Sequence, residues 1–203
     1  MTNPRRVVLH DIYKKGWIEL QDAASQAVAA LIPGKGRVLD FCAGGGGKCL
    51  AVSARTGGLV FAHDANPNRM LEIKVRALRG GHDINVILPD QIDGYGRFDS
   101  IFCDLPCSGS GAWRRSPEEK WSLTQADILE YQKLQREILV KAEGFVKLGG
   151  TLSMITCSIF NAENQAQRDF LLGKFKSLKV VSENQYLPTE NNDGLYIVIL
   201  QQT

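Results

Sequence analysis

A short apolar run leads into a glycine run and then into the start of a helical pattern in Val38-Leu39-Asp40-Phe41-Cys42-Ala43-Gly44-Gly45-Gly46-Gly47-Lys48. Such a unit lets the backbone approach a ligand and leaves free N–H groups at a helix N-terminus. Two phosphate-binding motifs fail here. The third glycine of a dinucleotide fingerprint would fall on Cys49 or Leu50, and Lys48 precedes Cys49 rather than the Ser or Thr of a P-loop. The stretch therefore predicts an α/β fold whose glycine loop does not hold a pyrophosphate.

On both sides of this stretch, apolar runs alternate with amphipathic stretches of helix length, which is typical of a mostly parallel sheet. Asp22 and Thr124 are expected to cap helices, and Gly80-Gly81 and Gly149-Gly150 are expected to end them. A short loop joins the last two apolar runs, which favours an antiparallel final strand. The expected strands are Arg37–Phe41, Leu59–Asp64, Asn85–Leu88, Ser100–Cys103, Thr151–Thr156, Lys179–Glu183 and Tyr196–Leu200. The expected helices are Asp22–Leu31, Lys48–Arg55, Asn66–Arg79, Thr124–Phe145 and Ala162–Phe175.

Acidic residues follow the next two strands. Asp64 ends the second strand about 20 residues after the glycines, where a carboxylate is placed to accept hydrogen bonds from ribose hydroxyls. Asp90 follows the third strand and is placed to face an adenine amino group. Each acid by itself is also typical of a surface or capping position. In this order after a glycine loop, they fit a nucleoside cofactor without a pyrophosphate, such as S-adenosylmethionine.

Two cysteines stand at the ends of two expected strands. Cys107 lies in Asp104-Leu105-Pro106-Cys107-Ser108-Gly109-Ser110-Gly111, and Cys157 lies in Thr156-Cys157-Ser158. In a parallel α/β sheet these strand ends open into the ligand crevice. Free cysteines are often simply buried core residues, but the acid, proline and glycines around Cys107 favour covalent chemistry. Chemical logic does not say which thiol performs which step.

Composition limits the class of protein. The 203 residues contain 44% hydrophobic and 23% charged residues, and their net charge of +2 gives no argument for nucleic acid. Apolar runs are too short for a membrane helix, and the N-terminus lacks a signal-peptide pattern. Five cysteines, an odd number, favour free thiols in the cytoplasm. The absence of a C-x-x-C pair and the scattered histidines argue against a metal. We expect one domain over residues 1–203, with a helical lead-in over residues 1–32, and a monomer.

Five motifs in the same order resemble the RNA (cytosine-5) methyltransferases of the NOL1/NOP2/Sun family, the RsmB-like enzymes. The first motif, similar to the family's G-x-x-x-x-Q-D-x-x-S-Q, is Gly16-Trp17-Ile18-Glu19-Leu20-Gln21-Asp22-Ala23-Ala24-Ser25-Gln26. The glycine loop is similar to C-A-x-P-G-G-K, and Asp193-Gly194-Leu195-Tyr196 is similar to D-G-F-F. D-L-P-C-S-G-S-G and T-C-S resemble the two cysteine motifs. The resemblance implies the class I S-adenosylmethionine-dependent methyltransferase (Rossmann-like) fold, with a seven-stranded, mostly parallel sheet whose last strand is antiparallel.

The resemblance also implies roles for the site residues. Cys157 would attack carbon 6 of cytosine, and Cys107 would help to release the product. Asp104 is our candidate for the acid beside ring nitrogen 3. The cofactor-binding residues would be Cys42, Ala43, Gly44, Gly45, Gly46, Gly47, Lys48, Asp64, Arg69, Asp90 and Asp104. The RNA-binding residues would be Lys48, Pro106, Ser108, Arg114 and Arg115, although each arginine by itself is more typical of a solvated surface.

The chain departs from the family pattern in two respects. Gly45 replaces the usual proline of the cofactor loop. Family members usually carry an additional RNA-binding domain, so target choice is expected to depend on residues beyond this sequence or on a separate partner. Ribosomal RNA is the target expected from family habit, and transfer RNA is the alternative.

Three other functions compete with this interpretation. A DNA cytosine-5 methyltransferase would use Pro106-Cys107, but Glu183-Asn184 comes too late in the chain for that class, which has no use for Thr156-Cys157-Ser158. A non-catalytic RNA-binding protein would not be expected to retain Asp104 and both cysteines. A Cys-His hydrolase would need a histidine in a comparable strand-end motif.

Overall fold

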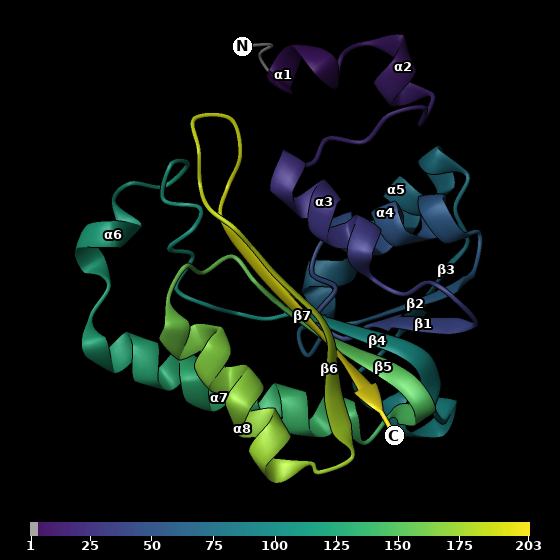
Figure 1. Cartoon of the computed structure of the whole chain (residues 1–203). Helices are drawn as coiled ribbons and strands as arrows, with labels where there is room; N and C mark the ends of the chain where they lie inside the picture. Colours follow the sequence, from purple (N-terminus) through teal and green to yellow (C-terminus); the bar gives the residue numbers. More distant parts are fainter. Residues whose placement is uncertain (1–3) are drawn as a thin grey trace.

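The computed structural model describes residues 4–203, so the first three residues of the expected lead-in lie outside the described residues. Seven strands form one sheet in the order β3-β2-β1-β4-β5-β7-β6 (Figure 1). Strand β7 pairs antiparallel with both β5 and β6, and the other pairs are parallel. The strands are β1 (Arg37–Asp40), β2 (Leu59–His63), β3 (Ile84–Ile87), β4 (Phe98–Asp104), β5 (Val146–Thr156), β6 (Leu178–Tyr186) and β7 (Leu195–Gln202). This is the seven-stranded sheet expected from the sequence.

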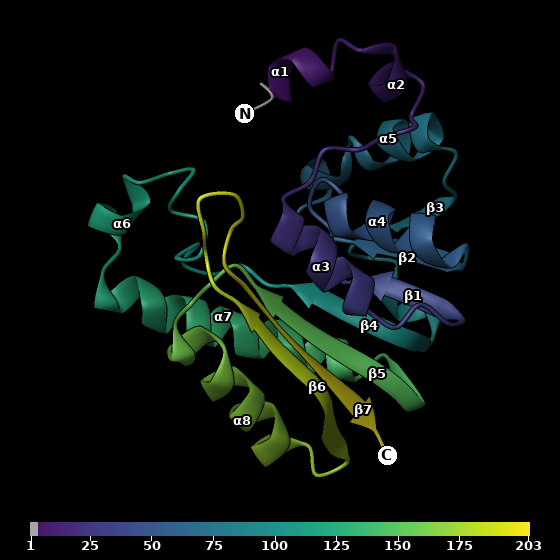
Figure 2. The same cartoon turned by 45° about the horizontal axis from the view of Figure 1, so that its top comes forward.

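Helices cover both faces of the sheet, as Figures 1 and 2 show. Helices α3, α4 and α5 lie on one face, and α7 and α8 lie on the other. The longer helices are α3 (Ala23–Leu31), α4 (Gly47–Thr56), α5 (Ile73–Gly80), α7 (Gln125–Glu143) and α8 (Gln165–Lys174). The single turns are α1 (Pro4–Val7), α2 (Asp11–Lys14), α6 (Glu119–Ser122) and the 3₁₀ turns η1 (Pro67–Met70), η2 (Ile92–Tyr95) and η3 (Asn161–Glu163). No helix within residues 4–203 is long and apolar enough to cross a membrane.

Each face of the sheet has its own hydrophobic core because successive strand residues point to opposite sides. In β1, Val38 belongs to the core under α3, α4 and α5, whereas Leu39 belongs to the core under α7 and α8. Both side chains are fully buried. A sheet buried on both faces leaves only its edges and strand ends for a ligand, which places the site at the strand ends.

Most expected elements form, with shifted ends. Asp22, Thr124 and Gly81 cap α3, α7 and α5 as expected. Gly149-Gly150 does not end a helix, because α7 ends at Glu143 and both glycines lie inside β5. The fully buried Val146 pairs with Phe98, which draws this segment into the sheet five residues before the expected start.

The expected helix over Asn66–Arg79 is two separate turns. The side chain of Asn66 caps η1, which ends at Met70, and α5 then begins at Ile73. A short 3₁₀ turn in place of the first helical turn changes which side chains face the sheet, since it has three rather than 3.6 residues per turn. Met70 at the end of η1 and Ile73 at the start of α5 are both buried.

Candidate active site

The carboxyl ends of β1, β4 and β5 meet at one edge of the sheet and open into a cleft of about 400 Å³. The glycine loop between β1 and α4 forms one wall, and the lead-in before α3 forms another. The loop before β7 and the start of that strand contribute Asp193 and Leu195. The lining residues are Leu20, Gln21, Asp22, Ser25, Asp40, Cys42, Ala43, Gly44, Gly45, Gly47, Lys48, Arg69, Asp104, Arg115, Cys157, Asp193 and Leu195.

The glycine loop is held in place by the acid that follows β2. Asp64 is buried, and its Oδ2 accepts a hydrogen bond of 2.9 Å from the Gly44 N–H. Its Oδ1 accepts from the Asn66 N–H at 2.9 Å, and Arg69 Nη1 lies 3.2 Å from Oδ2. Asp64 therefore supports the loop directly, and its proposed contact with a ribose stays a prediction.

A buried cation stands between two acids at the floor of the cleft. Lys48 Nζ lies 2.6 Å from Asp104 Oδ2, and the lysine side chain is only 11% exposed. Burial by itself lowers the pKa of Lys48, but the attraction of Asp104 outweighs it, so the net shift is upward. Burial, followed by the charge of Asp104, raises the pKa of Asp40. Lys48 thus remains a fixed positive charge where β1 and β4 end.

The two strand-end thiols touch. Cys107 Sγ lies 3.3 Å from Cys157 Sγ, and both cysteines are free and partly buried. This hydrogen bond lowers the pKa of Cys157, against the effect of burial, with smaller help from Lys48. The same hydrogen bond and burial raise the pKa of Cys107 well above its ordinary value. Cys157 is therefore the thiol that ionises more readily, and it is also the one that lines the cleft.

Cys107 lines a neighbouring cavity instead. This cavity of about 270 Å³ also includes Glu119 and Tyr131, from α6 and α7. The two thiols thus stand between two cavities, with Cys157 facing the glycine loop and Cys107 facing away from it. Cys107 thus lies beside a space that is distinct from the one beside the glycine loop.

The two arginines of the expected RNA contact are already paired. Arg114 Nη2 lies 3.0 Å from Asp193 Oδ1, and Arg115 Nη2 lies 2.7 Å from Asp193 Oδ2. Asp22, which caps α3, accepts a hydrogen bond from the Asp193 N–H and lies 3.4 Å from Arg114. Asp193 is buried, and its contact with Asp22 joins the lead-in to the loop before β7. Arg115 remains 62% exposed, which leaves it accessible to a phosphate.

Besides Cys107, the expected site residues Gly46, Asp64 and Arg114 are not part of the cleft lining, and neither are three others. Asp90 is exposed on the turn after β3. Ser108 is buried, and its N–H and hydroxyl groups both donate to Glu163. The Pro106 carbonyl accepts from Gln135. Contacts of these three with RNA or cofactor therefore stay predictions. Sequence reasoning missed Glu163, and it gave no site role to Asp22 or Asp193 although both lie in quoted motifs.

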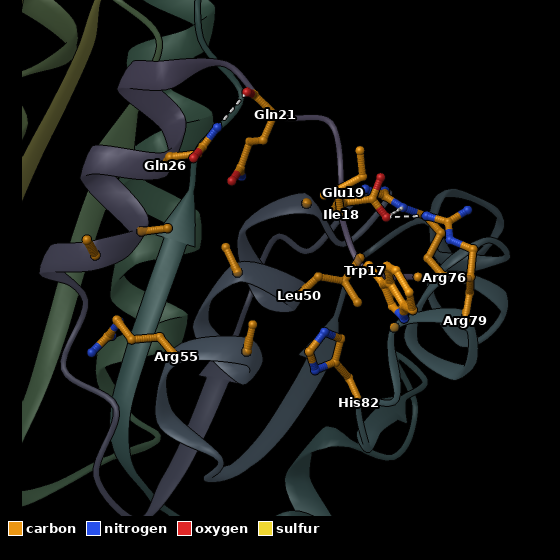
Figure 3. Close-up of a pocket in the computed structure, with 17 residues that line it drawn as sticks. Trp17, Ile18, Glu19, Gln21, Gln26, Leu50, Arg55, Arg76, Arg79 and His82 are labelled. Carbon is orange, nitrogen blue, oxygen red and sulfur yellow. Dashed lines mark hydrogen bonds and ion pairs between the residues drawn. The ribbon is translucent and has the colours of Figure 1, made fainter. Parts of the chain in front are cut away.

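A third cavity of about 360 Å³ lies under the lead-in (Figure 3). Trp17 and Glu19 of the lead-in face α5, where Glu19 pairs with Arg76 and Arg79. Gln26 of α3 donates to the Gln21 carbonyl, which fixes the turn between this cavity and the cleft. Within residues 4–203, no three His, Cys, Asp or Glu side chains are arranged to hold a metal ion.

Comparison with known proteins identifies the family. The sequence model described as 16S rRNA methyltransferase RsmB/F matches residues 28–201. A ribosomal RNA small subunit methyltransferase B of Sodalis glossinidius is 38% identical over 167 residues, covering 76% of this chain and 38% of that protein. The chain thus spans less than half of that relative's length.

Solved structures agree with the fold. A methyltransferase homologue from Pyrococcus horikoshii has a TM-score of 0.79 and 27% identity over 97% of this chain and 72% of that one. NSun6 from Pyrococcus horikoshii, solved with SFG, has a TM-score of 0.84 and 22% identity over 96% of this chain and 56% of that one. Because the family's sequence model spans nearly all of the sheet and of both cysteine motifs, the chain belongs to the RsmB/F family of 16S ribosomal RNA methyltransferases.

Proposed function

We propose that this domain methylates carbon 5 of a cytosine in RNA with S-adenosylmethionine, through a covalent bond between Cys157 and carbon 6. The observation that carries the proposal is the contact of 3.3 Å between two free thiols, of which Cys157 lines the same cleft as the glycine loop. Carbon 5 of cytosine is a poor nucleophile, and addition of a thiolate to carbon 6 activates it. A single cysteine suffices to attack, so a second one in contact supports a role in release.

The residues around the cleft fit the cofactor. Gly44, Gly45 and Gly47 line the cleft beside the N-terminus of α4, where residues without a Cβ let a ligand come close to the backbone. The cleft of about 400 Å³ is within the range of small-molecule sites. The relative NSun6 was solved with SFG, an S-adenosylmethionine analogue. Gly44, Gly45 and Asp64 would hold the cofactor, and when bound it supplies an electrophilic methyl group.

The attack step uses the pair of charges at the strand ends. The Cys157 thiolate adds to carbon 6, and the electron pair of the ring moves toward nitrogen 3. Asp104 shares a proton with that nitrogen, because Lys48 engages only its Oδ2 and leaves Oδ1 without a hydrogen bond in the described residues. The fixed charge of Lys48 stabilises the thiolate before attack and the electron-rich ring after it.

Release follows from the position of the thiol proton. While both thiols are free, this proton belongs to Cys107, because its pKa is raised and that of Cys157 is lowered. Once Cys157 has bonded to carbon 6, it no longer accepts the hydrogen bond that contributes most to holding that proton. Cys107 then loses its proton to solvent and accepts the proton from carbon 5. The electron pair of the broken bond to hydrogen restores the double bond between carbons 5 and 6, the bond from carbon 6 to sulfur breaks, and its electron pair returns to Cys157. The proton shared with nitrogen 3 goes back to Asp104, so one proton is released per methyl group.

Ribosomal RNA is the proposed substrate class, because the curated relatives are ribosomal RNA small subunit methyltransferases B. The target cytosine must be unpaired or flipped out of a helix to reach Cys157, at a cost of about a few kcal/mol. Arg115, with its largely exposed side chain at the cleft, is placed to meet a phosphate beside that base.

Two cysteine variants test the proposal. We expect Cys107→Ala to accumulate a covalent RNA–protein adduct, since it attacks but does not release, and Cys157→Ala to form none and to be inactive. Labelled RNA, cofactor and denaturing gels measure this directly. Cys103→Ala is the matched control, because Cys103 is buried in β4 beside Asp104 and lies outside the cleft. An adduct that appears only with Cys157→Ala would reverse the two roles.

Bisulfite sequencing of cellular RNA, with and without the gene, then identifies the modified cytosine. A new unmethylated cytosine in transfer RNA rather than in ribosomal RNA would change the substrate. No change at any cytosine would overturn the activity.

A further inference from the structure

A fully buried carboxylate lies outside the cleft, next to both cysteine loops. Glu163, in η3, is 0% exposed. Its Oε1 accepts hydrogen bonds from the Ser108 N–H at 2.9 Å and from Gln135 Nε2 at 3.1 Å. Its Oε2 accepts from the Ser158 hydroxyl at 2.6 Å and from the Ser108 hydroxyl. Four donors therefore surround one carboxyl group.

The four donors come from the segments that carry the two thiols and from α7. Ser108 directly follows Cys107, and Ser158 directly follows Cys157. Gln135, in α7, also donates to the Pro106 carbonyl at 3.0 Å, which ties the carboxylate to the residue before Cys107. Glu163 thus binds the residue after each cysteine directly, and it is linked through Gln135 to the residue before Cys107.

No cation accompanies this carboxylate: Glu163 forms no ion pair with the described side chains. Burying a polar or charged group without partners is costly, so a buried acid surrounded only by hydrogen-bond donors is retained where those bonds fix a geometry. The loops it joins begin at the ends of different strands, β4 and β5. Their thiols must nevertheless lie at hydrogen-bond distance for the proton between them to be shared.

We propose that Glu163 is a positioning residue that clamps the two cysteine loops together and thereby sets the contact between the Cys107 and Cys157 thiols. This inference rests on the proposed function for its catalytic consequence, although the clamp itself does not. Glu163 touches neither sulfur and acts through Ser108 and Ser158. Loss of the clamp separates the thiols, so Cys157 loses the hydrogen bond that stabilises its thiolate.

The first test needs neither RNA nor cofactor. Iodoacetamide reacts with thiolates, so the rate of Cys157 alkylation, followed by mass spectrometry at several pH values, reports how readily this thiol ionises. In Glu163→Gln the side chain keeps its length, but one of its two acceptor oxygens is replaced by a donor amide nitrogen. We expect the Cys157 profile to move upward by about one pH unit, which is about a tenfold slower alkylation at neutral pH. An unchanged profile in a folded variant overturns the proposal.

The matched control is Gln167→Ala. Gln167 is also fully buried and hydrogen-bonded, lies four residues later, and contacts Arg136 and Ala162 rather than a cysteine loop. It should reproduce any general loss of stability without moving the alkylation profile. If Glu163→Gln does not fold, Ser108→Ala and Ser158→Ala each weaken the clamp and should each move the profile in the same direction. Two unmoved profiles would also overturn the proposal.

The second test measures turnover. If the proposed chemistry holds, Glu163→Gln should lower kcat by about 10- to 100-fold, since misplacement by about 1 Å has this effect, and should leave KM for RNA nearly unchanged. If Glu163 had a purely structural role, the substitution would change the amount of folded protein, and it would not lower kcat while leaving KM unchanged. A wild-type protein that shows no methylation but whose alkylation profile moves with Glu163→Gln would refute the function and keep the clamp. A methylating wild type with an unmoved profile would do the reverse.

Discussion

At the scale of single residues, one buried cation influences the two acids and the Cys157 thiol. Lys48 lies 2.6 Å from Asp104 and contributes to the lowered pKa of Cys157. Because the lysine is almost fully enclosed, water screens its charge weakly. The site therefore depends on this side chain more than on the exposed arginines at its rim.

Replacing Lys48 with methionine should raise the pKa of Cys157, since a charge that favours the thiolate is lost. The pH profile of RNA adduct formation should then move to higher pH, with a loss on the order of 100-fold near neutrality. Adduct yield against pH, measured in the Cys107→Ala background, gives this result. The exposed Lys133→Met on α7 serves as the control. A profile that coincides with that of the parent protein would show that Lys48 does not act on the thiol.

The sequence predicted some site residues and missed others, depending on whether the neighbours of each residue in the chain form a recognisable motif. Asp104, Cys107 and Cys157 stand in contiguous motifs at strand ends, so a pattern of neighbours was sufficient to find them. Glu163 was missed because two of its three partners, Ser108 and Gln135, are far from it in the chain, although Ser158 is only five residues away. Nothing in the letters around Glu163 distinguishes a buried acid from a surface one. The pairing of both arginines with Asp193 was hidden for the same reason.

At the scale of elements, the glycine loop and the first turn of α4 determine how closely a ligand can approach the backbone. Gly46 caps α4 with a φ of 80°, a conformation that favours glycine, and Ile73 of α5 closes over it. Gly57 caps the other end of the same helix with a φ of 57°, and a methyl group added there would meet no atom within 4 Å. The two caps thus share a left-handed backbone conformation, and they differ in how much free space surrounds the position of an added methyl group.

This difference gives a paired prediction. Gly57→Ala should cost about 1–2 kcal/mol from the left-handed backbone alone. Gly46→Ala should cost about 1–3 kcal/mol more, because its methyl group must displace Ile73. Urea denaturation midpoints with unchanged m-values measure both. Equal losses would mean that Ile73 moves aside freely.

Element types were predictable, and their ends were less so. Strong periodicity identified every strand, and the side chains of Asp22 and Thr124 marked true helix starts. The start of β5 was misplaced because Gly149-Gly150 reads locally as a helix stop. The pairing of Val146 with Phe98, which overrides it, is a contact between distant segments.

At the scale of the whole molecule, the lead-in is tied to the domain at two places. Glu19 pairs with Arg76 and Arg79 of α5, and Asp22 binds the Asp193 loop. These contacts bring residues 20–25 into the wall of the cleft. The segment that resembles a family motif thus lies beside the glycine loop.

Glu19→Gln should loosen the lead-in without unfolding the sheet. Loss of both ion pairs should cost about 1 kcal/mol locally, which is roughly a fivefold increase in opening. Hydrogen exchange of peptides covering residues 11–22 should become faster by that factor, while peptides from β4 and β5 stay unchanged. Glu130→Gln is the control, since this residue is exposed on α7 and forms no ion pair with the described side chains. Equal exchange in both variants would show that Asp22 holds the segment by itself.

The position of β7 has a consequence for the order in which the protein becomes competent. Among the seven strands, β7 comes last along the sequence, yet it lies between β5 and β6, and Asp193 and Leu195 beside its start contribute to the cleft. A nascent chain that has emerged only as far as β6 holds both cysteines and the glycine loop without the wall that joins them. Because such long-range pairing forms late and slowly, the cleft is complete only after β7 has inserted between β5 and β6.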